Sequence, residues 1–238
     1  MSLHSQVYDL LLKRLRDTGT LIENGHFLYR SGKHGDTYVD HWRLLQDTKT
    51  LHDFSQSLAE RFTEPEDAID AVVGLERGGG YVAMWLAYHL SCMKGKNIPW
   101  FFVSKNEAEN FHYIDAEFSK QLEDKRILLA DDVVNTGSRL KETIDLLREV
   151  NGWPVGIAAL INRGSVHQSY FPFVQKFFSL LSLPLASWEP EECPKCKKGV
   201  PIDQKHGHGR HIIQKADPLL ASMLERGESP VSSNECLS

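Results

Sequence analysis

Two adjacent aspartates, Asp131 and Asp132, form the pair of side chains best suited to chemistry in this chain. They follow an apolar run in ILLADDVVNTGSRL (127–140), and the small polar turn NTGS comes directly after two valines. Paired carboxylates can hold hydroxyl groups or a metal ion, and backbone N–H groups at a turn that opens a helix can bind an anion. A sugar phosphate offers both kinds of group. The simpler alternative is that the aspartates only end a strand and cap a helix.

The elements that must position this motif are indicated by apolar patterning. Short apolar runs predict strands at 68–74, 98–103, 126–130, 155–161 and 176–182. Apolar residues at helical spacing predict helices at 51–62, 81–90 and 140–147. Strands that alternate with helices indicate an α/β fold around a central parallel sheet. Ligands of such sheets bind at the carboxyl ends of the strands, where the two aspartates are expected.

Length, charge and cysteine content exclude several classes of protein. The 238 residues carry a formal net charge of -5, so a general affinity for nucleic acid or for anionic membranes is not expected. No stretch approaches the roughly 18 uninterrupted apolar residues of a membrane span. Residues 1–19 do not resemble a cleaved signal. Four cysteines are too few for a secreted disulfide framework, so we expect a cytoplasmic protein.

The stretch ILLADDVVNTGS resembles the signature of the type I phosphoribosyltransferases: an apolar strand, two acidic residues, two small apolar residues and a Thr-Gly turn. The resemblance implies their Rossmann-like fold, with a central parallel sheet flanked by helices and an N-terminal hood. It also implies binding of phosphoribosyl pyrophosphate (PRPP), with the ribose hydroxyls held by Asp131 and Asp132. The other PRPP-binding residues that it implies here are Val133, Val134, Asn135, Thr136, Gly137, Ser138 and Arg139, the last five around the 5′-phosphate.

The segment LIENGHFLYRSGKHGDTYVD (21–40) is similar to the start of orotate phosphoribosyltransferases, with Gly35 where that family usually has Ser. By this likeness the segment forms a hood over the base, and its Arg30 and Tyr38 lie near the base. Without the likeness, it is only a turn with basic neighbours.

A second base-binding element is indicated by ALINRGSVH (159–167). Its Arg163 matches an arginine that pairs with the orotate carboxylate in the family, and a guanidinium suits bidentate carboxylate recognition. The resemblance adds Asn135 to the base-binding residues. Taken alone, Arg163 is a solvated loop residue.

The stretch VVGLERGGGYVA (72–83) predicts a strand, a loop and a helix. Glycines let backbone N–H groups approach a polyanion, and a guanidinium donates well to phosphate oxygens. The resemblance makes this the pyrophosphate loop, with Arg77, Gly78 and Gly79 binding PRPP. The alternative is that the glycines serve only close packing at the helix entry.

Residues 104–123 are polar and are expected to form an irregular lid. The resemblance implies a catalytic loop whose basic residues neutralise the leaving pyrophosphate. Lys105 is then the catalytic lysine, beside Asp131 and Asp132, although the loop is acidic overall. A lid lysine that serves a neighbouring subunit would favour a homodimer. Mg²⁺ is expected to arrive with the pyrophosphate and to need no protein metal ligands.

The C-terminal CPKCKKGVP (193–201), with HGHGRH (206–211), contains a possible zinc ligand set in Cys193, Cys196 and two histidines. The histidine spacing is not that of a zinc finger, and some orotate phosphoribosyltransferases have a similar segment. A structural zinc ion is therefore considered but not favoured.

These observations predict one phosphoribosyltransferase domain over 1–212, with a hood at about 20–45, a C-terminal extension at about 187–212, and a partly disordered helix or tail at 213–238. The predicted reaction transfers phosphoribose from PRPP to orotate and yields orotidine 5′-phosphate and pyrophosphate. Two alternatives remain open. One is the same chemistry on another nucleobase, and the other is a non-enzymatic regulator that senses PRPP.

Overall fold

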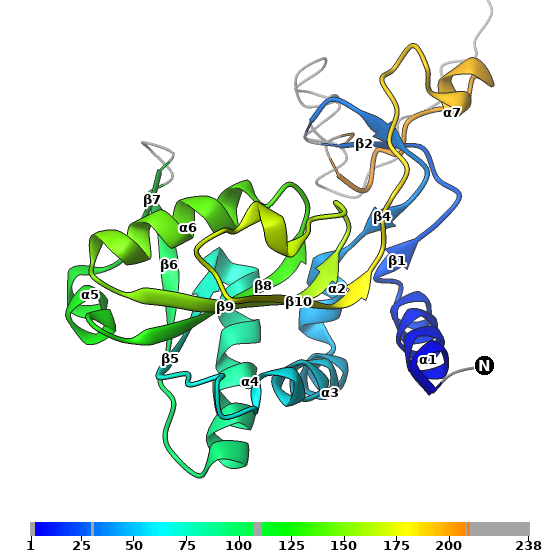
Figure 1. The fold of residues 1–238 in the computed structure, drawn as a ribbon. Coiled ribbons are helices and arrows are strands. Elements are labelled where there is room, and N and C mark those ends of the chain that lie inside the picture. The colour runs from blue at the N-terminus through cyan, green and yellow to red at the C-terminus, as the bar shows by residue number, and fades with distance from the viewer. Residues whose placement is uncertain (1–2, 30, 107–110, 208, 210–238) are drawn as a thin grey trace, which may run out of the picture. The chain divides into compact units, whose positions relative to one another are not determined.

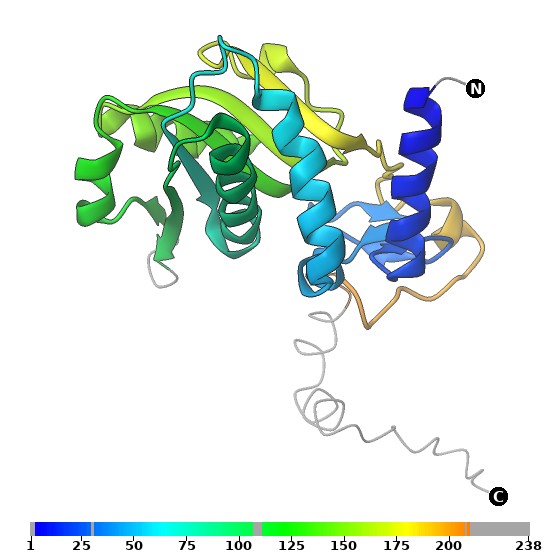
Figure 2. The same ribbon diagram turned by 90° about the horizontal axis from the view of Figure 1, so that it is seen from below.

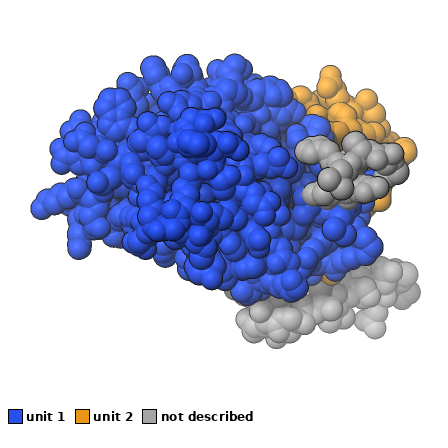
Figure 3. Space-filling model, turned by 60° about the horizontal axis from the view of Figure 1, so that its bottom comes forward, with its two compact units in different colours: residues 1–20, 41–185 blue, residues 21–40, 186–238 orange. Residues whose placement is uncertain are grey.

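The computed structural model describes residues 3–29, 31–106, 111–207 and 209. The chain divides into two compact units, coloured separately in Figure 3: unit 1 contains residues 1–20 and 41–185, and unit 2 contains residues 21–40 and 186–238. Each helix in the described part of the chain is too short or too polar to cross a lipid bilayer.

Unit 1 is built on a six-stranded sheet with the strand order β10-β9-β8-β5-β6-β7. Five strands are parallel: β5 (Ala71–Leu75), β6 (Trp100–Asn106), β8 (Arg126–Val134), β9 (Trp153–Asn162) and β10 (Lys176–Ser182). The edge strand β7 (Phe111–Tyr113) is antiparallel to β6. The central strands are apolar runs because both of their faces are buried. The predicted α/β fold with a central parallel sheet is confirmed.

Helices cover both faces of this sheet (Figure 1). On one face lie α3 (Thr48–Ala59) and α4 (Glu76–Lys94), which run side by side in Figure 2. The other face carries α5 (Ala116–Leu122) and α6 (Ser138–Glu149), whose Leu122, Leu140, Ile144 and Leu147 belong to one buried core with alternate residues of β5 and β8. The shorter helical segments of unit 1 are α2 (His41–Gln46), η1 (Glu60–Phe62) and η2 (Gln168–Tyr170).

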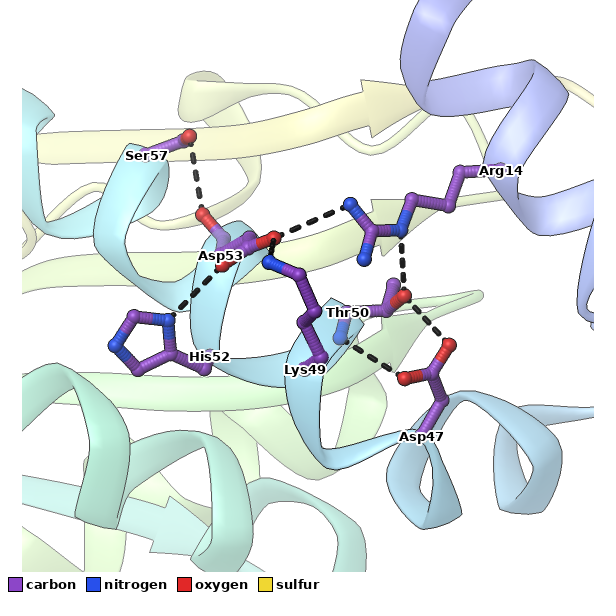
Figure 4. A network of polar contacts seen from close by, with 7 residues as sticks. All are labelled: Arg14, Asp47, Lys49, Thr50, His52, Asp53 and Ser57. Carbon is purple, nitrogen blue, oxygen red and sulfur yellow. Dashed lines mark hydrogen bonds and ion pairs between the residues drawn. The ribbon is translucent and has the colours of Figure 1, made fainter.

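The N-terminal helix α1 (Leu3–Asp17), which the sequence analysis did not predict, is joined to α3 by the polar network in Figure 4. Arg14 Nε donates to the buried Thr50 Oγ1 at 2.7 Å, and Arg14 also contacts Asp53 Oδ2 at 3.1 Å. Asp47 caps α3, because its carboxylate accepts from the Thr50 N–H and hydroxyl. The network attaches α1 to the helical layer of unit 1.

Unit 2 contains only short regular elements in its described residues. Strand β1 (Leu21–Ile22) pairs with β4 (Tyr38–Val39), and β2 (Phe27–Leu28) pairs with β3 (His34–Gly35), both antiparallel. The helix α7 (Pro194–Lys197) comes from the C-terminal segment. His34 and Trp188 exchange two backbone hydrogen bonds of 2.8 Å, which connect the two segments of the unit.

Most predicted bounds differ from the structure by a few residues, and three of the differences affect the site. The strand expected at 126–130 continues to Val134, because the apolar valines extend its pairing with β9. The helix expected at 81–90 already begins at Glu76, so the three glycines lie in its first turns. The interval 104–123 is not irregular in its described part, since β6 extends to Asn106 and β7 and α5 follow.

Candidate functional site

A cavity of about 770 Å³ opens in unit 1 at the carboxyl ends of the parallel strands. Three of its lining side chains come from separate elements: Lys105 from β6, Asp132 from β8 and Glu76 from α4. Aromatic residues supply much of the remaining wall, namely Trp42, Tyr81, Trp100, Phe102 and Tyr113. This is the position at which open parallel sheets bind their ligands.

A smaller cavity of about 60 Å³ lies at the NTGS turn, between the end of β8 and the start of α6. Gly137 caps α6 with a φ of +77°, a backbone conformation that glycine adopts without strain. No acidic residue occupies the first turn of α6, so the positive end of its dipole is available to an anion. Val133 and Arg139 line both cavities, which are therefore adjacent.

The two aspartates are almost fully buried, with exposed fractions of 2% for Asp131 and 6% for Asp132. Side chains alternate along a strand, and the two carboxyl groups accordingly line different cavities: Asp131 the small one and Asp132 the large one. Burial and the neighbouring Asp132 carboxylate raise the pKa of Asp131, although the Arg139 guanidinium, 3.8 Å away, opposes this. Because β8 continues through both aspartates, one aspartate lines each cavity.

Glu76 connects the large cavity to a charged network. Its φ of +48° is unusual for a residue with a side chain and places it between β5 and α4 under backbone strain. Arg139 lies 3.1 Å from one Glu76 oxygen, and His112 donates to the other. His112 also contacts Glu142 at 2.9 Å through its second ring nitrogen. A histidine between two carboxylates is held as a cation.

The pKa values in this network follow from these contacts. Burial lowers the pKa of His112, but its hydrogen bonds to Glu76 and Glu142 outweigh burial and raise the pKa. Burial raises the pKa of Glu76, but His112, Arg139 and Lys105 outweigh it and lower the pKa. These contacts favour the ionised form of Glu76 and the protonated form of His112.

Gly78 and Gly79, two of the three glycines at the start of α4, allow the helix to approach the sheet. A Cβ on Gly79 would lie 2.6 Å from the Ala130 carbonyl oxygen, and one on Gly78 would lie 2.5 Å from Asp132 Oδ2. A Cβ on Gly74 of β5 would lie 2.4 Å from the Gly79 carbonyl oxygen. The close-packing alternative therefore accounts for Gly79, whereas Gly78 leaves room for a carboxylate of the cavity.

The other predicted site residues have different outcomes. Lys105 lines the large cavity. Arg163 follows β9 and its N–H donates to the Val134 carbonyl oxygen at 2.9 Å, but its side chain is not among those lining the two cavities. Tyr38 belongs to unit 2, where its ring lies 5.5 Å from that of Phe27. Arg30 and the side chain of Arg77 lie outside the described residues.

Among the residues of the large cavity and its network, Glu76 and His112 were not predicted from the sequence. Glu76 directly precedes Arg77 in LERGGG, and this adjacency was its only signal. His112 lies within the polar interval 104–123, where only lysines were considered as cations. Two of the acidic residues of that interval serve α5 locally, because Asp115 caps the helix and Glu117 occupies its first turn. The acidic composition of the interval is thus partly a helix-start signal.

Residues 42–181, all within unit 1, match the phosphoribosyl transferase domain family. The orotate phosphoribosyltransferase of Caldanaerobacter subterraneus is 34% identical over 182 residues, which cover 76% of this chain and 88% of that protein. That of Thermotoga maritima is 31% identical over 195 residues, covering 82% and 96%. The crystal structure of orotate phosphoribosyltransferase from Aeropyrum pernix shares the fold, with a TM-score of 0.57 and 24% identity over 73% of this chain and 93% of that one.

Proposed function

Because this chain belongs to the phosphoribosyltransferase family, we propose that it transfers phosphoribose from PRPP to orotate, in pyrimidine nucleotide biosynthesis. The observation that carries this proposal is the pair of adjoining cavities at the end of β8, each with one buried aspartate. Both cavities lie in unit 1, largely within the residues that match the family, and the relatives that extend beyond that match are orotate phosphoribosyltransferases.

The donor fits the two cavities by charge and size. The 5′-phosphate binds at the NTGS turn, where residues at the start of α6 line the small cavity. The ribose extends along β8, so that Asp131 and Asp132 hold its hydroxyls. The pyrophosphate lies in the large cavity near Lys105, with backbone donors from Gly78 and Gly79 and the guanidinium of Arg77 as proposed partners.

The reaction breaks the bond between ribose C1 and the pyrophosphate oxygen and forms a bond from C1 to a ring nitrogen of orotate, which loses its proton. Positive charge develops on the ribose while negative charge develops on pyrophosphate. Asp132 stabilises the first, and Lys105 and Arg139 stabilise the second, since preorganised charges act strongly in a site shielded from water. Alignment of base and sugar supplies further acceleration.

The donor set of the large cavity also fits Mg²⁺ bound to the pyrophosphate. Asp132 and Glu76 offer carboxylate oxygens, which a hard divalent cation prefers. The ion would neutralise charge on the leaving group, and it would need few protein ligands because it binds through phosphates and water. Lys105 and Arg139 provide the remaining positive charge.

Orotate recognition is assigned to Arg163, Asn135, Arg30 and Tyr38. Arg163 and Asn135 are neighbours in unit 1, because Gly164 packs directly against the Asn135 carbonyl. The roles of Arg30 and Tyr38, and the hood role of residues 20–45 within a domain of 1–212, remain predictions from the family resemblance.

We also propose that the active form is a cytoplasmic homodimer. Exposed aromatic side chains gather at the large cavity, and such patches are typical of interfaces between protein chains: Trp42, Tyr81, Trp100, Phe102 and Tyr113. Four cysteines are too few for a secreted disulfide framework, which supports a reducing compartment. Light scattering on the purified chain measures the mass directly, and a monomer at micromolar concentration would contradict the dimer.

A turnover assay tests the function. Purified protein is incubated with PRPP, Mg²⁺ and, separately, orotate, uracil, adenine or hypoxanthine, and pyrophosphate release is measured. We expect release with orotate alone. Pyrophosphate release only with another base would show that this base, and not orotate, is the acceptor. PRPP binding without pyrophosphate release for any base would favour the non-enzymatic sensor. An Asp132→Asn variant serves as the control for contaminating activity.

A further inference from the structure

Two histidines and two cysteines of unit 2 converge on one point. His26 Nε2 lies 2.9 Å from His34 Nδ1, 3.5 Å from Cys193 Sγ and 3.5 Å from Cys196 Sγ. Cys196 Sγ lies 3.2 Å from His34 Nδ1, and all four atoms lie within 4.8 Å of one another. His26, His34 and Cys193 are buried. Four groups that can each donate an electron pair thus face a common centre.

These separations are those of a tetrahedral metal site. Bond lengths of about 2.3 Å to sulfur and about 2.0 Å to nitrogen place tetrahedral ligand atoms about 3.3 to 3.8 Å apart. Two of the sulfur–nitrogen distances above, both 3.5 Å, fall in this range, and the third, 3.2 Å, is slightly shorter. The nitrogen–nitrogen distance of 2.9 Å is shorter and requires a small outward shift of one ring.

The tautomer of His26 is set for metal binding. Its Nδ1 lies 2.7 Å from the Val200 carbonyl oxygen, which can only accept, so Nδ1 carries the proton. The lone pair of the neutral ring is then on Nε2, which faces the other three groups. A hydrogen-bonded pair of histidines would explain the contact between His26 and His34, but it would not require both sulfur atoms to approach the same nitrogen.

We propose that His26, His34, Cys193 and Cys196 bind one zinc ion. Two thiolates and two imidazoles fill all four positions of a tetrahedral zinc ion and leave none for water. The site is therefore structural rather than catalytic. Two thiolates balance the charge of Zn²⁺, which allows the site to be buried. The histidines differ from those considered in the sequence analysis: His206 contacts Asp203, and His208 and His211 lie outside the described residues.

Unit 2 has a physical need for such a link. Its strands in the described part have two residues each, and its buried apolar side chains there are Leu21, Phe27, Tyr29, Val39 and Cys193. Small units with little core depend on metals or disulfides for stability. The ligands come from two segments 159 to 170 residues apart, so the ion would join the hairpin β2–β3 to the turn around α7.

Metal content of the full-length protein tests this proposal. Elemental analysis of chelator-free preparations should give about one zinc per chain for the wild type and for Cys92→Ser, an exposed cysteine in unit 1. Cys196→Ser should retain little or no zinc. Because Cys196→Ser could fail to fold, Co²⁺ is also added to the metal-free wild type, where thiolate charge-transfer bands and intense tetrahedral d–d bands are expected.

Chelation supplies a second readout. Removal of zinc should lower the melting temperature of the wild type and of Cys92→Ser, and re-addition of Zn²⁺ should restore it. Wild-type protein that neither contains zinc nor binds Zn²⁺ or Co²⁺ would overturn the proposal, as would a disulfide between Cys193 and Cys196 in the native protein. These readouts do not involve turnover, so their outcome is separate from that of the orotate assay.

Discussion

The adjacent glycines Gly79 and Gly80 should respond in opposite ways to the same substitution. A Cβ on Gly79 would lie 2.6 Å from the Ala130 carbonyl oxygen of β8, a backbone atom that cannot rotate away. The nearest atom to a Cβ on Gly80 is Phe102 Cβ at 3.6 Å, an ordinary van der Waals contact. Both residues lie in α4, so the effect on helix propensity is matched and only the packing differs.

The magnitudes follow from these distances. Alanine in place of glycine in a helix stabilises by about 0.5–1 kcal/mol. Gly80→Ala should show this gain, which raises the melting temperature by about 1–4 °C for a chain of this size. Gly79→Ala must move α4 away from the sheet, and overpacking of this kind costs about 1–3 kcal/mol. Because the gain in helix propensity is common to both variants, Gly79→Ala should melt about 2 °C or more below Gly80→Ala.

Thermal and urea unfolding of the two variants, followed by circular dichroism, measure the difference directly. The wild type and the double variant complete the comparison, and the double variant should resemble Gly79→Ala. Equal stability of the two single variants would refute the close helix–sheet contact that positions the large cavity.

Three further outcomes are expected. Asp131→Asn should lower kcat/KM for PRPP by at least about 100-fold. The melting temperature should stay unchanged or rise, because burial and Asp132 disfavour the ionised form of Asp131 and so raise its pKa. A lower melting temperature with normal kinetics would contradict this. His112→Gln should destabilise the protein more at about pH 6 than at about pH 9. The pKa of His112 is raised by Glu76 and Glu142, so its charge contributes stability that is present below pH 6.5 and is lost as the pH rises through the folded-state pKa. Urea unfolding should therefore show a difference in unfolding free energy between variant and wild type at about pH 6 that disappears at about pH 9. Arg163→Ala should raise KM for orotate by about 10- to 100-fold, the value of a charge-assisted hydrogen bond, with KM for PRPP unchanged; an equal rise for both substrates would refute a role at the base.

The fold could be predicted to the extent that it depends on local runs of sequence. Strand β10 was predicted with the bounds that the structure has, because a short apolar run buried in a parallel sheet is visible without knowledge of its neighbours. The helix α1 was not predicted, since its attachment depends on the contact of Arg14 with Thr50 and Asp53 on α3. Boundaries decided by a partner element, such as the extension of β8 along β9, were wrong for the same reason.

The candidate site shows the same division. Asp131, Asp132 and the NTGS turn are contiguous in the chain, so their residue types and order were enough to propose a sugar-phosphate site. The separation of the two aspartates into different cavities was decided by strand alternation once β8 continued through them.

The contacts between residues far apart in the sequence were decided only by the tertiary structure. Glu76, His112 and Arg139 meet because α4, β7 and α6 begin or end at the same edge of the sheet. His26 and His34 meet the two cysteines only after the two segments of unit 2 fold together. A local pattern specifies which groups a segment offers, but the geometry of binding and catalysis depends on distances between segments, and these arise only from packing.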